Sequence, residues 1–152
     1  IFCTFALGLR QLYPRHKRKR RSVMDMYEDG LMSIYAKKIY ELFNEDSILA
    51  VHEIKAMAGF TKELNSKYES AMIELQMGMF ITVNGTKQKI SAKGEPYGWP
   101  STAYSKVETW AKEIVILSDN INPEDAKKEI LLRIEEIVPD AQQKKVNRFL
   151  GI

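Results

Sequence analysis

Apolar residues recur at helical spacing along most of the chain. Between Leu31 and Asn44 they return every three or four positions, which predicts an amphipathic helix. A shorter helix is expected from Val51 to Ala58, with Gly59 ending it. A third is expected from Ser66 to Met77, because its first four residues show the S-x-x-E pattern of a capping box.

The helical pattern returns in the last third of the chain. Residues Tyr104 to Leu117 are expected to be helical. Asn122 followed by Pro123 is typical of a helix start, with an N-cap side chain and a proline at the first helical position. That helix carries an apolar stripe up to Val138, and a last helix is expected from Ala141 to Leu150.

The segment between these helical parts has the character of strands. Two short extended runs flank Asn84 and Gly85, and Asn-Gly is the strongest local signal for a two-residue β-hairpin turn. With that turn, Lys87 and Lys89 would share one face of the hairpin. Tyr97, Trp99 and Tyr104 are expected to pack the return strand against the helices, with Trp99 buried against the first or third helix; the alternative is that these rings stack on bases.

Three helices followed directly by a hairpin predict a winged helix-turn-helix, in which the hairpin is the wing. The expected fold class is therefore mainly α with a small β-hairpin, completed by C-terminal helices. The expected domains are an apolar segment and basic arm at 1–24, the winged helix at 25–117 and a helical extension at 118–152.

Positive charge is concentrated near the N-terminus. The net charge is +3, yet seven basic residues and no acidic ones lie between Arg10 and Arg21. Without those seven, 16 of the 23 basic residues remain against 20 acidic ones, so the body is mildly acidic. A dense basic segment is suited to nucleic acid, an acidic partner or anionic lipid.

Composition narrows the classes of chemistry. One cysteine, Cys3, excludes an internal disulfide framework and a cysteine-rich zinc site. The two histidines, His16 and His52, have no acidic cluster beside them, so we expect no metal, other cofactor or small-molecule ligand. No apolar run reaches membrane-spanning length, and we expect a cytoplasmic protein that does not contact membranes.

Several stretches together resemble a known family. "YEDGLMSIYAKKIYEL", "IKAMAGF", "AMIELQMGMFITVNG" and "QKISAKGEPYGWPSTAY" are similar to winged-helix proteins related to the AlkZ/YcaQ DNA glycosylases, and more narrowly to the AlkZ-related DNA-binding members. The resemblance covers Tyr27 to Trp110, and "ELQM" followed by "GEPYGW" is its most specific part. It implies a winged-helix fold and DNA binding.

The resemblance does not carry catalysis. Glycosylases of that group use a Gln-x-Gln or Gln-x-Asp motif to handle the attacking water, whereas Gln76 here is followed by Met77 and Gly78. Gln142 and Gln143 have the wrong spacing. We therefore predict a protein that is not an enzyme, because no positioned base is evident. The alternative is part of a glycosylase-like repair enzyme whose catalytic region lies outside this chain.

The candidate contacts with double-stranded DNA are polar or basic side chains in three places. They are Lys62, Asn65, Lys67 and Ser70 at the third helix; Lys87, Lys89 and Lys93 on the wing; and Arg15, Lys17, Arg18, Lys19, Arg20 and Arg21 in the basic arm. Simpler explanations exist: a helix bearing several glutamates can be merely solvated, and lysines keep a hairpin edge soluble.

Two further functional alternatives remain open. The acidic body favours a winged-helix domain that binds proteins. The apolar stripe of the C-terminal helices would also suit a homodimer, as in a dimeric transcriptional regulator.

Overall fold

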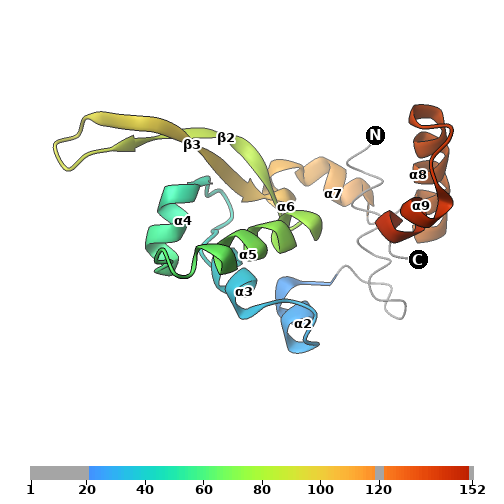
Figure 1. Cartoon of the computed structure of the whole chain (residues 1–152), viewed down its shortest axis with the longest axis horizontal. Helices are drawn as coiled ribbons and strands as arrows, with labels where there is room; N and C mark the ends of the chain where they lie inside the picture. The colour runs from blue at the N-terminus through green and yellow to red at the C-terminus, as the bar shows by residue number, and fades with distance from the viewer. Residues whose placement is uncertain (1–20, 119–121, 151–152) are drawn as a thin grey trace. The chain divides into compact units, whose positions relative to one another are not determined.

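The computed structural model describes residues 21–118 and 122–150 of the chain. Residues 22–112 form one compact unit, and the described residues from 113 onward belong to a second (Figure 1). The first unit contains, in order, α2 (Val23–Glu28), α3 (Ile34–Tyr40), β1 (Leu49–Ala50), α4 (Val51–Ala58), α5 (Asn65–Met77), β2 (Ile81–Ile90), β3 (Pro96–Lys106) and α6 (Val107–Trp110).

Helices α3, α4 and α5 lie where the sequence pattern predicts them; α4 has the expected bounds, whereas α3 and α5 differ at their starts. Helix α3 is shorter than expected and begins after Ser33, whose hydroxyl accepts a hydrogen bond from the backbone N–H of Ala36. Helix α5 begins at Asn65 with no side-chain cap, so the capping box expected from Ser66 and Glu69 is wrong. Glu69 instead accepts a hydrogen bond from the side-chain amide of Asn65 at 2.7 Å.

The strands form a three-stranded antiparallel sheet in the order β1-β3-β2. The short strand β1, which the hydrophobic pattern did not indicate, pairs Leu49 with Tyr104 and Ala50 with Ala103. Residues 104–106 therefore belong to β3, and the expected helix from Tyr104 is wrong over its first turn. Pairing with both neighbouring strands outweighs the local helical pattern there.

The turn expected at Asn84 and Gly85 is also wrong. Val83 pairs with Tyr104 and Thr86 with Thr102, so Asn84 and Gly85 both lie opposite one residue of β3 and form a bulge within β2. Gly85 has a φ of 84°, the left-handed conformation that made Asn-Gly look like a turn. The strands continue past this point and close at residues 91–95, where the N–H of Ser91 donates to the carbonyl of Glu95.

One apolar core holds the helices and the base of the sheet together. Its largest fully buried side chains are Phe80, Ile39, Ile54, Leu75 and Ile81, which come from α3, α4, α5 and the start of the hairpin. Burying a side chain of this size contributes roughly 1.5–3 kcal/mol. The hairpin is thus fixed at its base, while Figure 1 shows its closed end projecting past α4.

The second unit contains α7 (Lys112–Ser118), α8 (Pro123–Ile137) and α9 (Gln143–Leu150). The expected start of α8 is confirmed, because the side-chain oxygen of Asn122 accepts a hydrogen bond from the N–H of Glu124 at 2.9 Å. Ile130 of α8 and Val146 of α9 are buried together. Within residues 21–118 and 122–150, no helix combines the length and apolar character needed to cross a membrane.

Candidate nucleic-acid interface

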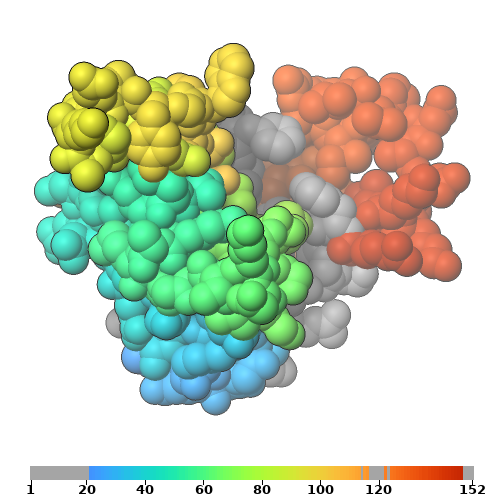
Figure 2. All heavy atoms as spheres, turned by 60° about the vertical axis from the view of Figure 1, so that its left-hand side comes forward, coloured from blue at the N-terminus to red at the C-terminus, as the bar shows by residue number. Residues whose placement is uncertain are grey.

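The hairpin is the basic part of the 22–112 unit. Residues 81–106 carry four lysines and one acidic residue, Glu95, whereas the rest of the unit carries six basic and eleven acidic residues. In Figure 2 the hairpin atoms lie above those of α4. The expected wing lysines therefore lie on a projecting element whose charge is opposite to that of the helices beneath it.

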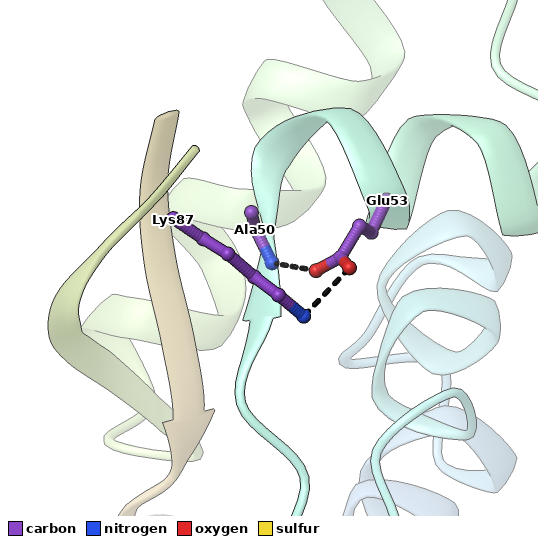
Figure 3. A network of polar contacts seen from close by, with 3 residues as sticks. All are labelled: Ala50, Glu53 and Lys87. Atoms are coloured by element: carbon purple, nitrogen blue, oxygen red, sulfur yellow. Dashed lines mark hydrogen bonds and ion pairs between the residues drawn. The ribbon is translucent and has the colours of Figure 1, made fainter. Parts of the chain in front are cut away.

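Lys87 is the exception among the wing lysines, because it is bound within the protein. Its Nζ lies 2.7 Å from Oε1 of Glu53 on α4 (Figure 3). The other carboxylate oxygen of Glu53 accepts a hydrogen bond from the N–H of Ala50 at 2.8 Å. The pair thus ties the middle of the hairpin to the start of α4.

The ionisation of Glu53 follows from these contacts. Partial burial raises the pKa of its carboxyl group, but the Ala50 N–H and the Lys87 ammonium together outweigh that effect. The net result is a pKa below the ordinary value of 4.5. Glu53 is therefore ionised at neutral pH and holds Lys87 by charge.

The other two wing lysines, Lys89 and Lys93, are not held in this way. In the part of the chain that the structure describes, neither Lys89 nor Lys93 forms an ion pair. Lys93 lies in the exposed closing loop, and Lys89 pairs across the strands with Tyr97. Directly paired residues share one face of a sheet, so Lys89 and Tyr97 lie on the same face of the hairpin.

Trp99 is 90% exposed, which overturns its expected burial. Lys87 pairs with Ser101 and Lys89 with Tyr97, so Gln88 lies opposite three residues of β3, Gly98 to Pro100. The side-chain amide of Gln88 donates hydrogen bonds to the carbonyls of Tyr97 and Gly98, at 2.8 and 3.0 Å. Trp99 is the middle residue of this three-residue bulge, in a part of β3 where residues 96–100 are all exposed.

Helix α5 carries only part of the DNA-contacting set expected there, because Lys62 lies in the segment before it. Lys62, Lys67 and Ser70 are exposed, but Asn65 is partly buried and already bound. Its side-chain oxygen accepts a hydrogen bond from Nζ of Lys55 at 2.6 Å, and its amide donates to Glu69. Asn65 therefore links α4 to the first turns of α5.

Two further polar side chains of α5 are used inside the protein. Glu74 accepts hydrogen bonds from the N–H and the hydroxyl of Ser33, at 2.9 and 2.7 Å, and so anchors the start of α3. Gln76, the glutamine of the incomplete glycosylase motif, donates to the carbonyl of Met72 at 3.0 Å. Neither contact was evident from the sequence, because both partners are backbone groups or distant in the chain.

Arm residues Arg15, Lys17, Arg18, Lys19 and Arg20 lie outside the described residues, which include only Arg21 of that group. Across residues 21–118 and 122–150, no three His, Cys, Asp or Glu side chains gather in a way that could hold a metal ion.

The AlkZ-related family model matches residues 9–151. The chain belongs to the AlkZ-related family. The match includes the arm and the C-terminal helices, so it extends well beyond the resemblance noted between Tyr27 and Trp110. The comparisons with curated proteins and with solved structures found no match.

Membership of the AlkZ-related family indicates a DNA-related function. In this AlkZ-related protein the exposed Tyr97 and Trp99 are the residues that sequence reasoning had assigned to packing. The stretch "PYGWP" did indicate an irregular strand at this point, since two prolines and a glycine around an aromatic residue are unfavourable in a regular paired strand.

Proposed function

We propose that this AlkZ-related protein binds double-stranded DNA through residues 22–112, as a non-catalytic winged-helix module of a bacterial, cytoplasmic protein. The order of elements supports this. Helix α3, strand β1, helices α4 and α5, and the hairpin β2–β3 follow one another as in winged-helix proteins, and the sheet order β1-β3-β2 also matches that fold. Helix α5 then occupies the position of the recognition helix.

The observation that carries the proposal is the separation of charge between the hairpin and the helices. Four lysines against one glutamate on a projecting hairpin can meet phosphates, whereas the acidic helices repel them. Because Lys87 is held by Glu53, Lys89 and Lys93 are the hairpin residues that contribute most. Lys62, just before α5, and Lys67 and Ser70 on α5 provide weaker contacts close to three glutamates.

The engagement of Gln76 with the carbonyl of Met72 supports the non-catalytic role. A side-chain amide that donates to its own helix is poorly placed to orient an attacking water.

The test is a titration with random-sequence duplex DNA over a range of salt concentrations. Each phosphate neutralised on duplex DNA contributes about −0.9 to the slope of log affinity against log salt. Replacing Lys89 and Lys93 together with alanine should therefore flatten the slope by up to about 1.8.

The matched control removes the same charge from α5 and the segment just before it. Lys62→Ala combined with Lys67→Ala should flatten the slope less than the hairpin pair does. Equal or larger flattening would move the main contact to α5. If the intact protein does not bind duplex DNA at low salt, the proposal is wrong.

A second candidate function, the binding of another protein, is favoured by the outward face of α5. Ile73 and Met77 lie four positions apart there, and they are 60% and 74% exposed. A recognition helix usually presents polar groups along such a face. If the intact protein is folded but does not bind DNA, this second candidate function is favoured.

A further inference from the structure

The bulge at Gly98 to Pro100 presents an aromatic residue to solvent in a fixed backbone setting. Gln88 holds the carbonyls of Tyr97 and Gly98 through two hydrogen bonds, and Gly98 has a φ of 65°. Pro100 restricts the backbone on the far side of Trp99. The ring is therefore exposed because of the hairpin's own geometry.

The surroundings of this ring are aromatic and basic. Tyr97, two positions before Trp99, is 54% exposed and pairs with Lys89. Lys93 lies in the adjoining loop, and Glu95 is the only acidic residue of the hairpin. Exposed aromatic rings beside unpaired cations match a nucleic-acid strand, whose bases stack on rings while its phosphates meet lysines.

A fully paired duplex can make only one of these two kinds of contact. Its phosphates are accessible to lysines, but its bases are stacked on one another and offer no free face to an indole ring. We infer that Trp99, assisted by Tyr97, forms a stacking surface for unpaired nucleobases, so that the hairpin prefers DNA containing unpaired bases. This inference rests on the proposed DNA-binding function and specifies the DNA structure that the hairpin selects.

The experiment compares two DNA probes that share one strand and are about two helical turns in length. One is fully paired, and the other has a central loop of unpaired thymines. The intact protein should bind the looped probe more tightly. Trp99→Ala should lower affinity for the looped probe about 5- to 150-fold, the range for loss of one stacked base. Its affinity for the paired probe should change by less than about twofold.

Two hairpin variants serve as controls. Trp99→Phe keeps a ring and should retain most of the preference. Ile90→Ala removes an apolar side chain that is 58% exposed on the same hairpin but carries no ring, and it should leave the preference unchanged. A direct signal comes from Trp110→Phe, which leaves Trp99 as the single tryptophan, whose fluorescence should be quenched by the looped probe.

The outcomes separate this inference from the function on which it rests. Suppose that Trp99→Ala leaves the preference for the looped probe unchanged, while Lys89→Ala combined with Lys93→Ala lowers the affinity for both probes. The hairpin then binds DNA by charge alone, and the stacking inference is overturned. An equal loss of affinity for both probes in Trp99→Ala also overturns the stacking inference. No binding of either probe by the intact protein overturns the inference and the proposed function together.

Discussion

The hairpin β2–β3 and helix α5 are both expected to meet DNA, yet they use their polar residues differently. On α5, Asn65 bridges Lys55 and Glu69, and Glu74 anchors Ser33, so much of its polar surface stabilises the fold. On the hairpin, within the described part of the chain, Lys89 and Lys93 form no ion pair. A polar side chain on a predicted interface element is thus a weak guide to contact until its partners inside the protein are known.

The same contrast separates the two ends of the hairpin. Phe80, at its base, is 1% exposed and lies edge-on to Tyr40, with ring centroids 5.8 Å apart. Trp99, in the β3 bulge toward the closed end, contributes little to the core. One end of the hairpin therefore stabilises the fold, and the other is available to a ligand.

The largest expected effect tests this division. Phe80→Ala should lower the free energy of unfolding by about 3–5 kcal/mol, because it removes a buried ring and leaves a cavity. Trp99→Ala should change it by no more than about 0.5 kcal/mol, as an exposed substitution. Urea denaturation followed by circular dichroism measures both. A loss above about 1 kcal/mol in Trp99→Ala would show that the ring is packed after all.

An intermediate effect tests the structural role of the acids on α5. Glu74→Ala should lower the free energy of unfolding by about 1–3 kcal/mol, because it removes the acceptor of two hydrogen bonds from Ser33. Glu69→Ala removes the same charge from an exposed hydrogen bond to Asn65, and should cost about 0.5 kcal/mol or less. Equal costs for the two variants would contradict the assignment of Glu74 as an anchor.

The smallest effect concerns the link between the hairpin and α4. Because the pKa of Glu53 is lowered from 4.5 by its contacts, its ionised form is favoured in the folded state. Its contribution to stability is therefore complete above the ordinary pKa and is lost as pH falls through the lowered one. Lys87→Ala should cost roughly 0.2–1 kcal/mol at neutral pH, since this ion pair is half-exposed on the lysine side.

The measurement is the free energy of unfolding of the intact protein and of the Lys87→Ala variant between neutral and acidic pH. The difference between them should disappear once Glu53 is protonated in both. Lys89→Ala, which breaks no ion pair in the described residues, should show no such dependence. A difference for Lys87→Ala that persists into strong acid would mean that its cost arises from packing.

Much of the helical architecture could be read from the chain. Helices α4 and α5 lie within a residue of their expected bounds, and the start of α8 follows from Asn122 and Pro123. These features depend on apolar spacing and on end signals within a few positions, so short-range sequence patterns contain them. The two-residue strand β1 could not be found in this way, because only its pairing with β3 makes it a strand.

For the candidate site, local patterns determined which residues are present, and the tertiary structure decided what they do. The sequence alone determined a family, a basic arm and a lysine-bearing hairpin. Only the tertiary structure showed that Asn84 and Gly85 form a bulge, that Lys87 is held by Glu53, and that Trp99 is exposed. The physical reason is that the glycine of an Asn-Gly pair can take the left-handed backbone in a turn and in a bulge alike, so the choice depends on cross-strand partners far away in the chain.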